Sequence, residues 1–345
     1  MLDSAAARGA SRARLVGLVC AVVVLAIWTS FILVARGSAA RTLTPLDIAW
    51  LRFVFSGLVA LPFVAWRWRR VRQGLGGDTR TAATRLAGLT LAAGVGYCGL
   101  AYSGFFFAPA AHAAVLMPGS LPLWTALFAM ALLGERLGAA RWAGLALIVL
   151  GDLLVGGASL LATLQGGGPT WRGDLLFLLA GMCWALYGVL ARRWRVGAVD
   201  ATLAVAFGCL VSAVPLYALA VAGGLVESRI AQAPWGEIAF QAVYQGGLAM
   251  LVAGIAFTQV VTTFGPLKTT MMTAVVPPLA ALGAVPLLGE PLGAAALGGL
   301  ACVTLGLLLG VGLLRRPLAG WAGWAGRGVG PVAGPVKGRV KERDA

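Results

Sequence analysis

The chain has 345 residues, of which 60% are hydrophobic and 11% charged, and its mean hydropathy is +0.89. That charged fraction is too small to cover the surface of a soluble globular protein of this size, so the lipid bilayer is the expected partner. The net charge of +15 does not indicate nucleic-acid binding, because the basic residues stand in short segments between apolar runs, where they orient a chain in a membrane.

Gly, Pro and clusters of charge divide the chain into ten apolar segments, each near the roughly 20 residues that cross a bilayer as a helix. In chain order they cover about 15–36, 45–66, 86–107, 110–133, 140–161, 171–192, 201–222, 237–263, 268–289 and 293–314. Thr44 and Pro45 predict an N-cap followed by Pro at the first helical position of the second segment. The expected fold class is an all-α membrane protein with ten transmembrane helices.

The basic residues predict which ends of these helices face the cytoplasm. With the N-terminus inside, 22 Lys and Arg residues fall on the cytoplasmic side and 5 on the other side. Both termini are then cytoplasmic, as basic tails over residues 1–13 and 315–345, and the second tail is expected to be disordered. The five cysteines stand apart from one another and from the single histidine, so neither a metal nor a cofactor is expected.

One short motif occurs twice. LLGERLG occupies Leu132–Gly138 and LLGEPLG occupies Leu287–Gly293, at an offset of 155 residues. The same offset superposes Pro122 on Pro277 and Gly151 on Gly306. We therefore interpret the chain as one unit written twice.

A second match supports this interpretation. A shift of 156 residues superposes IWTSFILVAR on CWALYGVLAR and brings Trp28 onto Trp184. The two five-helix units then cover residues 14–161 and 171–314. Because five is an odd number of crossings, the second unit is inverted relative to the first, and a pseudo-two-fold axis in the membrane plane relates the two.

The carboxylate of the repeated motif, Glu135 in the first unit and Glu290 in the second, is expected at the start of the fifth and tenth helices. There the positive end of the helix dipole favours a negative charge. A structural cap is one interpretation, and a role in gating is the other.

The arrangement resembles the EamA-type family of the drug/metabolite transporter superfamily. The residues that carry the resemblance are a Trp late in the first and sixth segments, Leu51-Arg52-Phe53 in the second, and a Pro-containing helix that twice ends in Leu-Gly-Glu. The resemblance covers residues 14–314. It implies a bacterial inner-membrane carrier, often an exporter of amino acids, other metabolites or toxic compounds, with a central cavity between the two halves.

Several side chains are candidates for this substrate cavity, each with a structural alternative. The polar groups of the eighth segment could bind a substrate or join helices, the two superposed prolines could line the cavity or only kink their helices, and the aromatic rings could stack on a substrate or serve packing. The candidates are Trp28, Tyr102, Pro122, Trp184, Tyr187, Gln241, Tyr244, Gln245, Gln259 and Pro277.

Charged groups inside a membrane are costly and usually functional. For Arg52 the sequence leaves two readings open, an anionic group of the substrate or a structural partner such as Asp47. Asp152, in the fifth segment, could couple transport to protons or make a polar packing contact. His112 could relay protons or hydrogen-bond near the membrane surface.

These features predict a secondary transporter of a small-molecule substrate that works by alternating access, with proton coupling as one option. A non-transporting scaffold subunit is the alternative. A membrane-embedded enzyme is disfavoured, because its chemistry needs paired carboxylates, a histidine cluster or a nucleophile beside a base, whereas this chain has one histidine and one acid, Asp152, deep within a predicted span. Gly306 and Gly310 suit close helix contact within one chain or across a homodimer.

Overall fold

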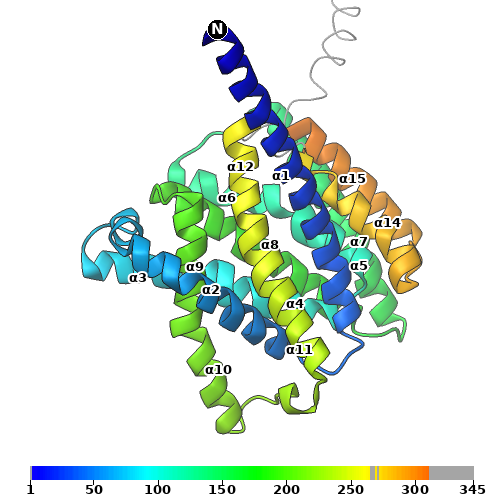
Figure 1. Ribbon diagram of the computed structural model, residues 1–345. Helices are drawn as coiled ribbons and strands as arrows, with labels where there is room; N and C mark the ends of the chain where they lie inside the picture. Colours follow the sequence, from blue (N-terminus) through cyan, green and yellow to red (C-terminus); the bar gives the residue numbers. More distant parts are fainter. Residues whose placement is uncertain (1, 265–268, 270–271, 311–345) are drawn as a thin grey trace, which may run out of the picture.

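The protein is described here by a computed structural model that covers residues 2–264, 269 and 272–310, with side chains from residue 12 onward. All regular elements in this part of the chain are helices (Figure 1), which confirms the predicted all-α class. The predicted tail over residues 315–345 and the predicted cytoplasmic Lys268 lie outside the described residues.

The helices follow one another along the chain with short connections. They are α1 (Leu2–Ser38), α2 (Pro45–Gly74), α3 (Thr79–Leu89), the π-helix η1 (Thr90–Gly96), α4 (Tyr97–Phe105), α5 (Ala110–Ala114), the π-helix η2 (Val115–Gly119), α6 (Leu121–Leu133), α7 (Ala139–Leu164), α8 (Thr170–Arg193), α9 (Ala198–Val211), α10 (Ala213–Ala222), the 3₁₀-helix η3 (Ile230–Gln232), α11 (Trp235–Gln241), the π-helix η4 (Ala242–Val252), α12 (Ala253–Phe264), α14 (Val276–Leu288) and α15 (Ala294–Gly310).

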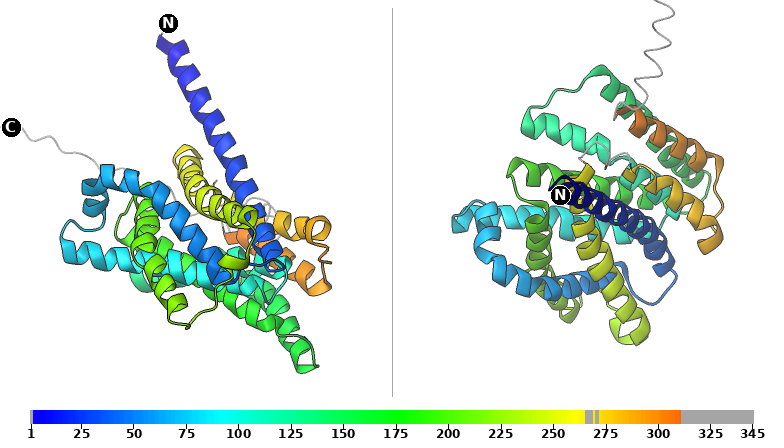
Figure 2. Two further views of the ribbon diagram at one scale, coloured as in Figure 1. Left: turned by 60° about the horizontal axis from the view of Figure 1, so that its bottom comes forward. Right: turned by 45° about the horizontal axis from the view of Figure 1, so that its top comes forward.

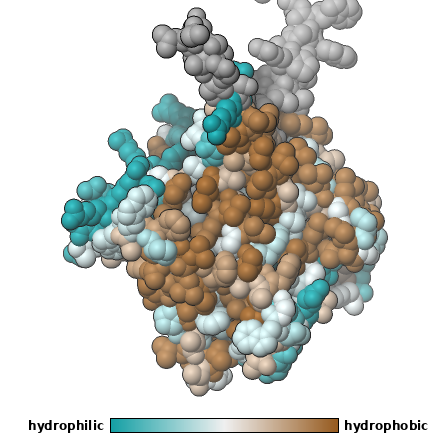
Figure 3. All heavy atoms as spheres, viewed as in Figure 1, coloured by the Kyte–Doolittle hydropathy of each residue, from teal (hydrophilic) through white to brown (hydrophobic). Residues whose placement is uncertain are grey.

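Eight helical runs are long and apolar enough to cross a membrane, and each coincides with one of the first eight predicted segments. α14 and α15 are shorter, and the two segments predicted there, 268–289 and 293–314, extend onto residues outside the described ranges. Figure 3 shows a broad apolar surface over α1, α12 and α14, with polar residues gathered where α2 meets α3. The described residues thus give eight full spans and two shorter apolar helices.

The start of α2 shows how the local sequence sets a boundary. Thr44 and Asp47 form a capping box: the Thr44 hydroxyl accepts the Asp47 amide at 3.2 Å, and the Asp47 carboxylate accepts the Thr44 amide at 2.9 Å. Pro45 is the first helical residue. The predicted N-cap is confirmed.

At the N-terminus, by contrast, residues 2–13 are not a separate tail but continue α1, whose first turns project from the bundle (Figure 2).

The two halves pack against each other with exchanged partners. α1 of the first half packs on α12 and α14 of the second, and its counterpart α8 packs on α4 and α6 of the first. α2 packs on its own counterpart α9, and α7 packs on its counterpart α15. This exchange of partners is what a two-fold relation between the halves requires.

The direction of the paired helices shows that the halves are inverted. A Cβ atom added to Gly144 would lie 2.7 Å from the carbonyl oxygen of Gly306, and one added to Gly151 would lie 2.7 Å from that of Gly299. The contact therefore moves backward along α15 as it moves forward along α7, so these equivalent helices run antiparallel. Only glycines allow so close a backbone approach, and the Gly306 face of α15 is therefore already filled within one chain.

α2 and its counterpart behave in the same way. Near the start of α2, Trp50 donates to the carbonyl of Val214 at 3.2 Å, whereas near its end Arg67 lies 3.1 Å from the Asp200 carboxylate. α2 and the α9–α10 run are thus antiparallel as well.

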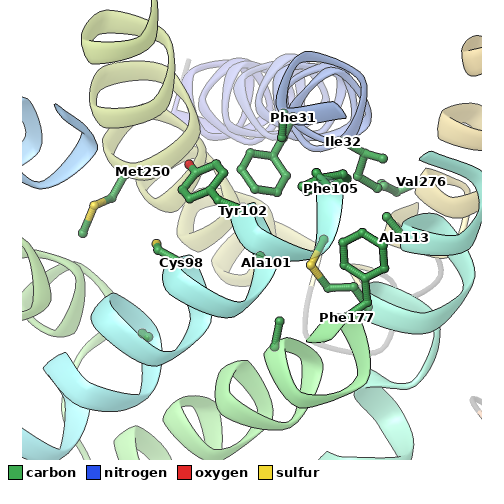
Figure 4. Packing of buried hydrophobic residues seen from close by; sticks show 14 of the residues in the cluster. Phe31, Ile32, Cys98, Ala101, Tyr102, Phe105, Ala113, Phe177, Met250 and Val276 are labelled. Carbon is green, nitrogen blue, oxygen red and sulfur yellow. The ribbon is translucent and has the colours of Figure 1, made fainter. Parts of the chain in front are cut away.

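The core lies where α1, α4 and α8 meet (Figure 4). Phe105 of α4 is fully buried, with its ring centroid 4.9 Å from that of Phe177 on α8 and 6.2 Å from that of Phe31 on α1. The third span of each half also contains a π-helix, η1 in one and η4 in the other, and π-helical turns often occur at functional sites.

Candidate functional site

A cavity of about 100 Å³ lies between the two halves. Its walls come from α1, α2, α4, η2, α6, α8, η4 and α14, so both halves contribute. The lining residues are Trp28, Phe31, Ile32, Arg52, Tyr97, Met117, Pro118, Leu121, Gly181, Trp184, Ala249 and Val276. All but Arg52 are apolar, aromatic or glycine, and ligand sites in proteins commonly combine such walls with a few polar groups.

A larger hollow of about 640 Å³ lies between α2, η1, α9 and α10. Its walls are almost entirely apolar and carry no charged side chain. The described residues that line this hollow offer a few hydroxyl groups but no charge, whereas the smaller cavity contains Arg52 and both halves line it, so the smaller cavity is the better candidate site.

Among the residues expected in the cavity, Trp28 of α1 and Trp184 of α8 line it, together with the charge candidate Arg52 of α2. The two tryptophans are equivalent in the two halves. Trp28 stacks on Phe257, with ring centroids 5.1 Å apart, and Trp184 lies 4.9 Å from Tyr97. The other expected residues are not among those that line it: Tyr102, Pro122, Tyr187, Gln241, Tyr244, Gln245, Gln259 and Pro277.

Among the described residues of the cavity wall, Arg52 is the one charged group. Its side chain is 4% exposed, and its Nη1 donates to the Tyr102 hydroxyl at 3.2 Å. Its Cζ lies 5.9 Å from the centroid of the Phe31 ring. The Nε atom is buried without a partner, and within the described part of the chain no carboxylate oxygen lies within 4.0 Å of the guanidinium.

Asp47, the structural partner considered for Arg52, is occupied elsewhere. Besides its capping bonds, its carboxylate accepts the hydroxyls of Tyr217 and Ser228, both at 2.7 Å, and the backbone amide of Arg229 at 3.0 Å. These bonds join the start of α2 to α10 and to the loop that follows it. The structure therefore corrects that reading, since Asp47 does not neutralise Arg52.

The glutamines of the eighth span join helices. Tyr102 donates to the Gln245 side-chain oxygen at 2.9 Å, Gln245 donates to Gln241 at 3.2 Å, and Gln241 donates to the Ser38 hydroxyl at 2.6 Å. This buried chain of neutral groups runs from Arg52 to the end of α1. Of the two roles considered for these polar groups, binding a substrate or joining helices, the hydrogen bonds correspond to the second.

Of the two other candidate residues of that span, Tyr244 bonds to another helix and Gln259 bonds within its own helix. The Tyr244 hydroxyl lies 2.5 Å from that of Ser30 on α1, and the Gln259 amide donates to Thr263 at 3.2 Å. Tyr187 lies beside the cavity-lining Trp184, with ring centroids 5.3 Å apart.

We expected Pro122 and Pro277 inside continuous helices that they could kink, but the structure places both prolines at helix starts. Each is the second residue of a helical segment, α6 and α14 respectively, that follows a break in its span. At that position the missing amide hydrogen would have had no helical partner anyway. The matched prolines therefore start the second part of each span, and the cavity is lined by their neighbours Leu121 and Val276.

Asp152 and His112 stand away from the cavity wall. Asp152 on α7 is 8% exposed, and neither carboxylate oxygen has a hydrogen-bond partner in the part of the chain that the structure describes. His112 on α5 has two hydrogen-bond partners: its Nδ1 lies 2.8 Å from the Asp174 carboxylate on α8 and 3.4 Å from the Ser159 hydroxyl on α7. His112 thus joins three helices.

The repeated motif ends its helix in the same way in both halves. Gly134 follows α6 with φ +69° and Gly289 follows α14 with φ +68°, a left-handed conformation that glycine adopts without strain. The next amide, that of Glu135 or Glu290, bonds back into the last turn at 3.3 or 3.4 Å. The glutamates are thereby placed identically in the two halves.

The prediction that these glutamates start the next helix is wrong. α7 begins at Ala139 and α15 at Ala294, four residues further on, and α7 has Gly138 as its N-cap. The Glu290 carboxylate instead lies 2.5 Å from Arg36 Nε at the end of α1, and Glu135 lies 2.6 Å from Arg192 Nη2 at the end of α8.

Each of these salt bridges joins one half to the other. Arg36 and Arg192 are equivalent by the shift of 156 residues, as are the two glutamates by the offset of 155. Because α7 and α15 run antiparallel, the glutamates that precede them lie at opposite ends of the bundle. Sequence reasoning missed both arginines as site residues, although each ended a superposed stretch.

Comparison with known proteins relates the chain to a family, to a curated protein and to a solved structure. The sequence matches the profile of the EamA-like transporter family twice, over residues 15–157 and 171–311. The uncharacterized transporter YyaM of Bacillus subtilis (strain 168) is 28% identical over 227 residues, which cover 64% of this chain and 71% of that protein. A solved crystal structure with 23% sequence identity covers 88% of this chain and 99% of its own, with a TM-score of 0.54, and supports the fold alone.

Proposed function

Because the chain belongs to the EamA-like transporter family, we propose that it is a secondary transporter that exports small metabolites, such as amino acids, related compounds or drugs, by alternating access. It is a multi-pass membrane protein. In this proposal ten helices form two inverted five-helix repeats in the bacterial plasma membrane, with both termini in the cytoplasm. The distribution of basic residues supports this orientation, and a homodimer remains a prediction.

The observation that carries the proposal is the matched pair of salt bridges between the halves. A carrier of this kind needs one closure on each side of its cavity, and two inverted halves supply two equivalent closures. The Arg36–Glu290 bridge and the Arg192–Glu135 bridge stand at opposite ends of the molecule and each crosses from one half to the other. We assign them as the two gates.

The size of the cavity supports movement. Sites for small molecules commonly enclose roughly 300–1,000 Å³, whereas this cavity encloses about 100 Å³. A metabolite therefore fits only after the halves separate at one end. The breaks at Ser120 in the fourth span and before Val276 in the ninth are places where a helix can bend with little loss of hydrogen bonds.

Coupling to protons is assigned to Asp152. A buried carboxyl group without a hydrogen-bond partner is costly when ionised, so it can gain and lose a proton as its surroundings change. In the coupled carrier Asp152→Asn removes the dependence on a pH gradient and leaves exchange down a concentration gradient intact. Glu227→Gln, at an exposed carboxylate, is the matched control. Unchanged dependence on the pH gradient in Asp152→Asn would remove this assignment.

The proposed function is tested with purified protein in liposomes. Labelled amino acids, aromatic carboxylates and cationic drugs are offered in parallel, and saturable flux of at least one class above that of empty liposomes is expected. Arg36→Glu places two carboxylates at one gate and should change the rate of that flux. A complete lack of flux across the panel, from protein that elutes as a folded species, would contradict transport.

A further inference from the structure

The guanidinium of Arg52 is a buried charge that has no counter-charge among the residues that the structure describes. Its side chain is 4% exposed, yet the structure gives it a single hydrogen bond, to the neutral Tyr102 hydroxyl. An arginine carries five N–H donors and stays charged in proteins. Burial of a charge that is not paired costs several kcal/mol, on the order of the cost for one ion of a buried pair, so this arrangement is expected only where something else supplies the negative charge.

The described side chains around Arg52 do not supply it. The bonds that continue from Tyr102, through Gln245 and Gln241, consist of neutral groups. Asp47 is fully bonded at the start of α2, and the Asp152 carboxylate makes no hydrogen bond to any described residue, Arg52 included. Since none of the described side chains is placed to supply it, a molecule that enters the cavity is the candidate source of the negative charge.

The walls of the cavity indicate the rest of that molecule. Trp28 and Trp184 lie on equivalent helices of the two halves, and Phe31 and Tyr97 complete an aromatic lining. Aromatic rings favour flat apolar groups through offset or edge-to-face contact. The lining contains no Asp or Glu, so a free ammonium group would find no carboxylate there.

We propose that the cavity binds an organic monoanion, namely a carboxylate attached to an aromatic body, with Arg52 as its counter-charge. This assignment rests on the proposed function, because it names the substrate class of the same site. Arg52 offers a planar fork that matches a carboxylate in two parallel hydrogen bonds. The proposal narrows the range of substrates: cationic drugs are excluded, and amino acids bind less well than acids without an ammonium group.

Binding to three ligands of one shape tests the charge directly. Phenylacetate, phenylacetamide and phenethylamine carry a negative, a neutral and, at neutral pH, a positive group on the same ring. Calorimetry with the whole chain in lipid nanodiscs should give affinity for phenylacetate at least about tenfold above that for the amide, because hydrogen bonds to a charged group are the stronger ones. Equal affinities, tighter binding of phenethylamine, or no detectable binding of phenylacetate would each overturn the proposal.

Variants then assign the preference to Arg52. Arg52→Gln should remove the difference between phenylacetate and phenylacetamide, and Arg52→Lys should keep part of it because the charge remains. Arg172→Gln is the control, since it removes the same charge from an exposed position outside the cavity. An Arg52→Gln protein that still prefers phenylacetate tenfold would overturn the assignment, and the comparison of ligands in the unaltered chain stands even if that variant fails to fold.

The binding result and the transport result separate cleanly. If phenylacetate binds through Arg52 but no solute of the labelled panel crosses the liposome membrane, the proposed transport is contradicted and this site is supported. Flux of other solutes without binding of phenylacetate would support transport and overturn this site.

Discussion

The two salt bridges at opposite ends of the bundle are built from the same motif but held differently. Arg36 also donates to the carbonyl of Phe105 at 2.7 Å, and Glu290 also accepts the amide of Ala110 at 2.8 Å. The side chains of that bridge are 28% and 17% exposed.

The Arg192–Glu135 bridge has neither addition. It consists of one hydrogen bond of 2.6 Å, and its side chains are 53% and 42% exposed. Exposed ion pairs contribute about 0–1 kcal/mol, whereas partly buried, charge-assisted bonds contribute more. The comparison teaches that the two halves are joined firmly at the Arg36 end and only loosely at the Arg192 end.

The largest expected effect comes from removing one arginine at a time. Arg36→Gln removes the charged bonds to Glu290 and Phe105 and should lower the free energy of unfolding by about 2 kcal/mol. Arg192→Gln should lower it by no more than about 0.5 kcal/mol, because its bridge is exposed. Chemical denaturation in mixed micelles measures both. Equal decreases in the free energy of unfolding for the two variants would contradict the difference between the two bridges.

Exchanging the partners of each bridge sharpens the comparison. Arg192→Glu with Glu135→Arg should restore full stability, because that bridge has no further contact. Arg36→Glu with Glu290→Arg should remain about 1 kcal/mol or more below the original, because the buried amide of Ala110 loses its acceptor. The same denaturation experiment applies, and complete rescue at both ends would contradict the role of Ala110.

Substituting either of the glycines that position the glutamates should lower the stability by a similar amount, whereas the two salt bridges are expected to differ. Gly134→Ala and Gly289→Ala each force a side chain into the left-handed region, at about 1 kcal/mol. Nothing lies within 4 Å of a Cβ atom at either site, so the cost comes from the backbone alone. Thermal melting should show similar decreases for the two variants, and a clear difference would mean that the two turns are not equivalent.

Salt should produce the smallest effect and act mainly at one end. Raising the ionic strength from about 0.05 to 0.5 M screens exposed charges far more than partly buried ones. The small stability loss of Arg192→Gln should vanish at high salt, whereas most of the loss of Arg36→Gln should persist. A loss for Arg36→Gln that disappears equally would show that its bridge is as exposed as the other.

Much of the fold could be predicted because bilayer thickness and local chemistry act on short stretches of sequence. Eight of the predicted segments coincide with helices, and the Thr44 cap is where the sequence places it. The inversion followed from a count of crossings, and the antiparallel contact of Gly144 with Gly306 agrees with it.

The site was harder to predict because it depends on contacts between distant residues. Arg36 meets Glu290 across 254 positions, and no local pattern reports such a contact. The sequence does not decide whether Arg52 pairs with a substrate or with Asp47, because a spacing of five residues cannot show that Asp47 already binds Tyr217. A signal did exist: opposite charges repeat at nearly the same offset in the two halves.

The central claim, that one cavity opens alternately through two gates, is tested most directly by thiol accessibility. Ala249 lines the cavity, and Ala249→Cys in a chain without its five native cysteines provides a single reporter for a membrane-impermeant maleimide. Arg36→Glu should shift labelling to the face that carries Glu290, and Arg192→Glu should shift it to the opposite face, as read in right-side-out and inverted vesicles. Labelling from the same face in both variants, or from neither, would contradict alternating access through these gates.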